Sequence, residues 1–198
     1  TAGQVLRLTD GRVAAAPFHA ACGGHTADPR LAFGGEGTGA AAVPDPRCPP
    51  ARWTARLTPR QVGASLRGAL ARAGWPPPPG DGLRAADLAV ATGPGGWVAQ
   101  VAAPGLGFRL SGDAAARALD AALGRGRVRS SRFELADEGG QVVLRGQGHG
   151  HGVGLCQAGA SARARAGDGW RAILGAYFPA AQLAPLAGGP PLLVGAAR

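Results

Sequence analysis

The sequence of 198 residues contains no Lys, Met or Asn, and all 21 of its basic residues are Arg. This pattern is typical of a coding bias, so the arginine content by itself carries no functional information. Aromatic residues make up only 5% of the chain, and the Arg residues are scattered along it. A nucleic-acid-binding surface usually clusters its charge and interleaves aromatic side chains for stacking. The composition therefore argues against nucleic acid as the partner.

Long apolar runs are also absent. No stretch reaches the roughly 18 apolar residues of a membrane span, so no such helix is expected. The chain opens "TAGQVLRL", without an initiator Met or the apolar core of a signal peptide, and we expect it to be a processed or truncated piece. A hydrophobic content of 45% indicates a globular protein. The formal charge of +9 favours anionic partners such as the bacterial wall, although solubility explains it equally well.

Capping and turn residues predict short elements of both kinds. Thr58-Pro59-Arg60-Gln61 predicts a helix start with a capping box. Further helices are expected from Ser111 to Leu123, from Gln157 onward, and after an N-cap at Asp168. Strands are expected on both sides of Thr9-Asp10-Gly11 and at 52–57, 88–92, 97–103, 107–110, 128–135 and 141–148. The fold class expected is α+β, with an antiparallel β-rich core and three or four short helices.

We expect residues 1–198 to form a single domain. Residues 23–51 are rich in Gly, Pro and Asp and predict a long ordered loop. Residues 75–82 contain four consecutive prolines and predict a stiff connector inside the domain. Residues 184–198 predict an irregular C-terminal tail.

Histidine and cysteine are few and concentrated. "FHAACGGHT" holds His19, Cys22 and His25, and "GHGHGVGLC" holds His149, His151 and Cys156. Three interpretations remain open for the thiols. We place a Cys22–Cys48 disulfide first and small buried thiols second. A zinc site comes third, because Cys22 and His25 have a usable spacing but no second ligand pair follows; its candidates are Cys22, His25, Cys48 and Cys156. No cofactor is certain from the sequence, and zinc is the one that these residues could bind.

The glycine-rich stretch "GQGHGHGVG" at 146–154 fits no phosphate-binding loop, since it lacks both G-x-G-x-x-G and G-K-[ST]. The chain also lacks the G-x-S-x-G turn of serine hydrolases. Alternating glycines let a backbone pass close to a ligand or to another strand. With its histidine donors, the stretch suits one wall of a cleft that grips a polar polymer such as a glycan.

Enzymatic cleavage of a glycan needs a carboxylic acid with a raised pKa. The chain has only three Glu residues, Glu36, Glu134 and Glu138. Glu36 lies between Cys22 and Cys48 and is the best candidate within the chain. The alternative for all three is a solvated surface carboxylate.

Several of these segments resemble one family over nearly the whole chain. "PFHAACGGHTADPRLAFGG", "VPDPRC" and "GQGHGHGVGLCQAGASARARAGDGWRAILGAYFPAAQL" are similar to the SpoIID/LytB family of bacterial sporulation and amidase-enhancer proteins. The last matches the family signature G-x-G-W-G-H-G-V-G-(M/L)-(S/C)-Q-x-G-A, with His149 in place of the usual Trp.

The resemblance implies a peptidoglycan lytic transglycosylase of the cell envelope, in the periplasm or cell wall, with a role in wall remodelling or sporulation. One Glu would protonate the leaving oxygen and then accept the proton of the C6 hydroxyl, giving 1,6-anhydro products from strands without stem peptides. The family's catalytic Glu lies before the first strand, so we expect it upstream of this chain. The family's metal-binding cluster also lies mostly upstream. The alternative is a non-catalytic module that binds the wall and enhances a partner N-acetylmuramoyl-L-alanine amidase.

Carried onto this chain, the resemblance supplies a glycan-binding cleft. His151 and Gln157 are the best candidates for hydrogen bonds to the sugar. A core histidine that donates to a backbone carbonyl is an equal alternative for His151. One wall would comprise His19, Cys22, Gly23, Gly24, His25 and Thr26, and the other Gly150, His151, Gly152, Gln157 and Gly159.

Overall fold

The computed structural model describes residues 3–33, 38–74, 76, 80 and 82–186. The described residues form an α+β fold of small, mainly antiparallel sheets, which confirms the fold class expected from the sequence. The helices are α1 Arg30–Phe33, α2 Pro59–Arg72, α3 Gly112–Leu123, α4 Gln157–Arg165 and α5 Trp170–Tyr177. The strands are β1 Gln4–Leu8, β2 Phe18–His19, β3 Arg52–Leu57, β4 Ala89–Thr92, β5 Val98–Ala103, β6 Phe108–Ser111, β7 Phe133–Glu138, β8 Gln141–Gln147, β9 Leu155–Cys156 and β10 Ala181–Pro185.

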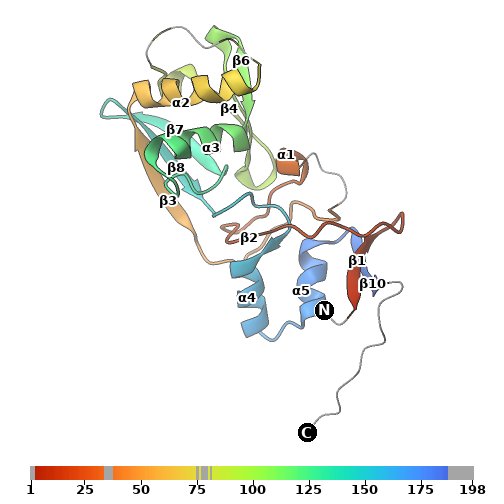
Figure 1. Ribbon diagram of the computed structural model, residues 1–198. Helices are drawn as coiled ribbons and strands as arrows, with labels where there is room; N and C mark the ends of the chain where they lie inside the picture. Colours follow the sequence, from red (N-terminus) through yellow and green to blue (C-terminus); the bar gives the residue numbers. More distant parts are fainter. Residues whose placement is uncertain (1–2, 34–37, 75, 77–79, 81, 187–198) are drawn as a thin grey trace.

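The larger of two cores lies under α2 and α3, which pack on one another (Figure 1). Two antiparallel sheets supply its strands, in the orders β3-β8-β7 and β4-β5-β6. Strand β3 alternates exposed and buried side chains, with Trp53, Ala55 and Leu57 inward, as its sequence predicts. Leu57 and Leu144 are fully buried, and each contributes about 1.5–3 kcal/mol by leaving water.

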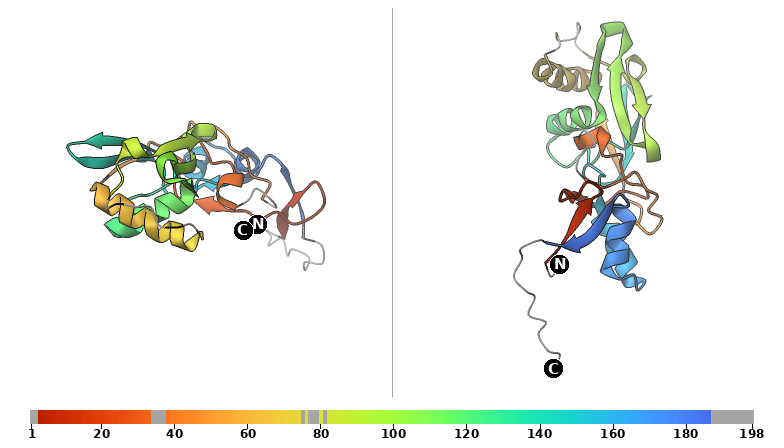
Figure 2. Two further views of the ribbon diagram at one scale, coloured as in Figure 1. Left: turned by 90° about the horizontal axis from the view of Figure 1, so that it is seen from above. Right: turned by 90° about the vertical axis from the view of Figure 1, so that its right-hand side faces the viewer.

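The smaller core lies at the opposite end of the molecule, between α4, α5 and the β1–β10 pair (Figures 1 and 2). Tyr177 and Phe178 fill it, and all three cysteines belong to it. Ala27, Trp97 and Val153 form a third cluster. Trp97 follows the turn between β4 and β5, whereas Val153 belongs to the glycine-rich stretch. This cluster therefore joins the two ends of the molecule.

Most local predictions agree with the structure. Helix α2 begins after Thr58 with the expected capping box, and α3 begins after Ser111. The β4–β5–β6 meander and the β7–β8 hairpin form as expected, although β7 begins at Phe133. Within the predicted loop 23–51, the described residues 23–33 and 38–51 form no helix or strand apart from the short α1.

Three local predictions were wrong. The turn at Asp10-Gly11 forms, but β1 pairs with β10 along its length and contacts the returning segment only through an Arg7–Val13 bridge. Residues 181–185 form a strand, because their backbone groups pair with those of β1. Two of them, 184 and 185, were expected to belong to the irregular tail. Asp168 is not the N-cap of α5; Gly169 is, and Asp168 pairs with Arg47. Most of the Pro-rich connector and residues 187–198 lie outside the described residues.

Candidate functional site

The two segments rich in His and Cys meet in the structure. Strand β2 pairs in parallel with β9, which places His19 opposite Cys156. Ala21 and His149 exchange two backbone hydrogen bonds of 2.7 and 3.2 Å. The sequence predicted two walls of a cleft, but the two segments pack directly on one another, so most of their side chains face the protein.

The glycines of the C-terminal stretch make room for bulky groups of the chain itself. A Cβ on Gly152, whose φ is +77°, would overlap the ring of the fully buried Trp97. A Cβ on Gly159 would overlap the Asp45 carboxylate and the Tyr177 hydroxyl. These two glycines therefore provide the close approach to another part of the chain that was one of the two roles considered from sequence.

The predicted sugar-binding residues differ in exposure. Thr26 is buried and its hydroxyl donates to the Ala41 carbonyl at 2.9 Å. Gln157 is exposed. His25 is half-buried and lies against Gly95, and one of its ring nitrogens lies 2.8 Å from the Thr26 carbonyl. The remaining residues of this predicted set, His19, Gly23, Gly24, Gly150, His151, Gly152 and Gly159, are all buried or half-buried.

His151 makes two backbone hydrogen bonds that fix its tautomer. Its Nδ1 accepts from the Val153 N–H at 3.1 Å, so Nε2 carries the proton that is donated to the Phe18 carbonyl at 3.0 Å. Burial, together with the nearby His19, lowers the pKa of His151. This geometry matches the alternative of a histidine that donates to a backbone carbonyl.

The three cysteines and Asp45 form a fully buried group (the thiol cluster: Cys22, Asp45, Cys48 and Cys156). One ligand atom from each residue lies within 4.8 Å of the ligand atoms of the others, so the group could hold a metal ion. Cys48 Sγ and Cys156 Sγ are 3.5 Å apart, and Cys22 Sγ is 3.5 Å from Asp45 Oδ2. His25, a ligand candidate from the sequence, is not part of this group.

All three cysteines are free thiols, so the structure does not contain the Cys22–Cys48 disulfide expected from the sequence. The sulfurs of Cys48 and Cys156 also lie well beyond the about 2.05 Å of an S–S bond. The structure places Cys156 beside Cys22 and Cys48. All three thiols therefore meet in one group, instead of two forming a disulfide and the third lying elsewhere.

Asp45 is the ligand that the sequence interpretation missed. Its carboxylate accepts a hydrogen bond from the Tyr177 hydroxyl at 2.7 Å and pairs with Arg163 at 3.4 Å. Its backbone N–H donates to the Gly24 carbonyl, which ties it to the turn after Cys22. The spacing Asp45-x-x-Cys48 within "VPDPRC" was the signal that could have identified it.

The thiols differ in acidity because of their hydrogen bonds. Cys156 accepts from Cys22 and from the backbone N–H of Gly159 at the start of α4, and the hydrogen bond from Cys22 is the main cause that lowers its pKa, to about 3. The same bond, with burial, raises the pKa of Cys22. Burial raises the pKa of Cys48. The cluster therefore favours a thiolate at Cys156.

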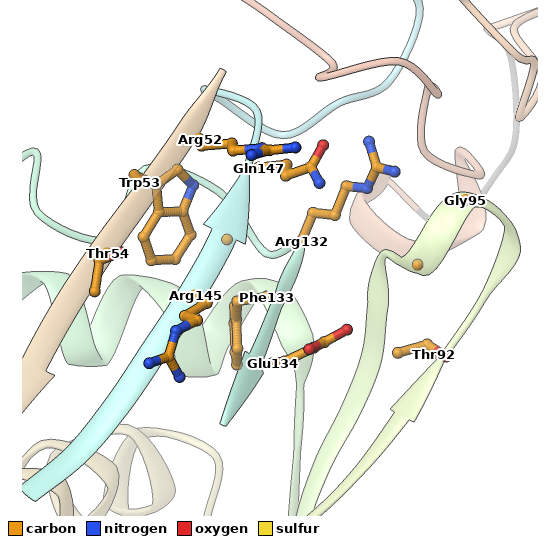
Figure 3. A pocket seen from close by; sticks show the side chains of 12 residues that line it. Arg52, Trp53, Thr54, Thr92, Gly95, Arg132, Phe133, Glu134, Arg145 and Gln147 are labelled. Atoms are coloured by element: carbon orange, nitrogen blue, oxygen red, sulfur yellow. The ribbon is translucent and has the colours of Figure 1, made fainter. Parts of the chain in front are cut away.

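A separate groove of about 510 Å³ lies over the β3–β8–β7 sheet (Figure 3). Arg52, Gln147 and Arg132 lie at one end of it, and Arg145 and Glu134 lie farther along the strands. Arg132 donates to the carbonyls of Cys22 and Gly23 at 3.0 and 2.9 Å, so this end adjoins the turn after Cys22. No sequence pattern indicated the groove, because its residues come from segments that are distant in the chain.

Two of the three glutamates, Glu134 and Glu138, lie on β7. Glu36 lies outside the described residues. Glu134 lines the groove, whereas Glu138 pairs with Arg145, and the hydrogen bond from that arginine lowers the pKa of Glu138. A general acid needs the opposite shift, so Glu138 is unsuited to that role.

No protein-family model matches the sequence, and no curated protein is significantly similar to it. The function must therefore be argued from the sequence signature and from the two features just described, the thiol cluster and the groove. Among the described residues, none of the helices combines the length and the apolar character needed to cross a bilayer.

Proposed function

We propose that the chain binds glycan strands of the bacterial cell wall, as the resemblance to the SpoIID/LytB family implies. The observation that supports this proposal best is the groove over β3, β8 and β7, which is lined by three arginines and one glutamate. A muramic acid residue without its stem peptide carries a free lactyl carboxylate. Arginine binds carboxylates with charge-assisted, often bidentate hydrogen bonds, so a peptide-free strand is the ligand class that this groove suits.

In the intact protein, the bound strand would be cleaved without hydrolysis to 1,6-anhydro products. The general acid for that step is proposed to lie upstream of the present chain. The environment of Glu138 supports this view, since its pKa is lowered. Glu134 is the remaining carboxylate at the groove, and its replacement by Gln tests whether the described residues supply any activity.

Binding is tested by co-sedimentation with peptide-free glycan strands, using Arg52→Gln in the groove and Arg60→Gln on α2 as a matched control. Both arginines are exposed and both changes remove one charge, but only Arg52 lines the groove. A charge-assisted hydrogen bond contributes about 1.5–3 kcal/mol, so Arg52→Gln should weaken binding about tenfold or more. Equal binding by the two variants would refute the role of the groove.

A second candidate function is that of a non-catalytic module that enhances a wall amidase. The direct packing of the two signature segments on one another favours it, because it makes them part of the scaffold. Mass spectrometry of glycan strands incubated with the chain, with and without its upstream segment, separates the two. Anhydro products support the transglycosylase, whereas stimulation of an amidase without such products supports the enhancer. Salt-sensitive DNA binding stronger than glycan binding would refute both.

For the metal-binding group we propose zinc. Three thiols and one carboxylate, all buried, supply the number and type of ligands that a tetrahedral zinc site uses. The cluster differs from the candidates named from sequence by the exchange of His25 for Asp45.

A further inference from the structure

We infer that Cys22, Asp45, Cys48 and Cys156 form a closed four-ligand zinc centre that locks three distant segments of the chain together. The inference rests on the zinc part of the proposed function and is independent of the glycan part. It concerns the role of the ion, which is structural, and the identity of all four ligands.

Two separations within the thiol cluster are close to those of tetrahedral zinc, and all the others lie within 4.8 Å. Bonds of about 2.3 Å to sulfur and about 2.0 Å to oxygen place two sulfur ligands about 3.8 Å apart, and a sulfur about 3.5 Å from an oxygen. The Cys48–Cys156 sulfur separation and the distance from Cys22 Sγ to Asp45 Oδ2 are both 3.5 Å. The side chains thus lie close to the positions that the ion requires.

Backbone amides surround the sulfurs as they do in thiolate centres. The N–H groups of Cys22 and Gly159 donate to Cys156 Sγ at 3.2 and 3.3 Å, and the N–H of Gly24 donates to Cys22 Sγ at 3.4 Å. Such donors stabilise negative sulfur and orient ligands around a metal. Cys156 is also the N-cap of α4, where the helix dipole favours a thiolate.

A metal ion would compensate the charge that its ligands acquire on binding. If all four ligands were ionised, as metal binding requires, they would carry a formal charge of −4 in a buried site, which is costly without compensation. Arg163 pairs with Asp45 at the edge of the cluster and supplies one positive charge. A divalent ion at the centre would supply two more and would contact all four ligands directly.

His19 shows an unmet polar group next to the cluster. It is buried opposite Cys156, and its Nδ1 lies 3.2 Å from the Val153 carbonyl, a contact that needs the proton on Nδ1. The buried Nε2 then has no hydrogen-bond partner. A metal-bound thiolate carries no proton that this nitrogen could accept, so the orphaned Nε2 marks the neighbourhood of the cluster as polar without identifying its occupant.

The segments that the ion would join explain its structural role. Cys22 follows β2, Asp45 and Cys48 lie in the loop before β3, and Cys156 begins α4. No position in the set is left open for water, which is typical of structural rather than catalytic zinc. Because the ligands are fully buried, the ion would bind during folding and stabilise the folded state.

The test uses the complete chain, refolded with and without zinc, and measures metal content by elemental mass spectrometry. We expect one zinc per chain, a lower melting temperature after chelation, and visible d–d bands with a thiolate charge-transfer band when cobalt replaces zinc. Absence of these bands and of stoichiometric zinc would refute the zinc proposal and this inference together. The spectra use the wild-type chain, so a misfolded variant cannot produce that result.

Variants then test the ligand set. Asp45→Asn should weaken zinc binding at least about tenfold, and Cys48→Ser should weaken it by more than the roughly 10–100-fold that follows loss of an outer-shell partner. Asp168→Asn is the matched control, because Asp168 also pairs with Arg163 but lies outside the cluster. Zinc bound equally by Asp45→Asn and Asp168→Asn would refute the four-ligand centre while leaving zinc in place. Loss of zinc from His19→Gln, but not from Asp45→Asn, would refute it too.

Discussion

Replacement of Gly152 by Ala tests why the glycine-rich stretch contains glycine. The residue has a φ of +77°, and a Cβ there would overlap the buried ring of Trp97. The left-handed conformation costs an L-residue about 1–2 kcal/mol, and overpacking of a filled core costs about 1–3 kcal/mol. The variant should therefore lose about 2–5 kcal/mol of unfolding free energy, a large part of the stability of a typical domain.

Two further glycines separate these contributions. Gly167 has a φ of +92° with no atom near its Cβ position, so Gly167→Ala should show only the backbone cost. Gly105 has open space and no positive φ, so Gly105→Ala should be neutral or slightly stabilising. Urea unfolding monitored by tryptophan fluorescence gives the three free energies from midpoints at a common m-value. If Gly152→Ala costs no more than Gly167→Ala, the contact with Trp97 is not the reason for the glycine.

Two other outcomes follow from single side chains. His151 has a lowered pKa, so the unfolded chain takes up its proton first; stability should fall as the pH drops below about 6.5 and level off below the folded pKa. NMR titration of the ring should give a midpoint below about 6.5, and a midpoint above it would contradict the tautomer set by Val153 and Phe18. Thr58→Ala removes the N-cap hydroxyl that accepts from Gln61 N–H and should cost about 1 kcal/mol in urea unfolding. An unchanged midpoint would show that α2 does not depend on this cap.

The helix starts at Thr58 and Ser111 and the strand at 52–57 could be predicted from the sequence, because caps and strand alternation depend on only a few neighbouring residues. Thr58 and Gln61 satisfy the first amides of α2 whatever packs on the helix. Ser111 does the same for α3. The alternation along 52–57 places Trp53 and Leu57 on one face by the geometry of a strand alone.

Contacts between residues that are distant in the chain could not be predicted from local sequence patterns. Strand β1 lies beside β10 rather than in a simple hairpin, since a ladder forms with whichever strand the tertiary fold brings close. Asp45 lies in the loop predicted at 23–51, and only the fold places it against Cys22 and Tyr177.

The sequence by itself determined the α+β class, the starts of α2 and α3 and the concentration of His and Cys in two segments, because each depends on local spacing. Only the tertiary structure decided that these segments pack on one another, that three thiols converge with Asp45, and that arginines from separate strands line one groove. These features depend on contacts between residues up to 134 positions apart, and the packing of the whole chain is what selects such contacts.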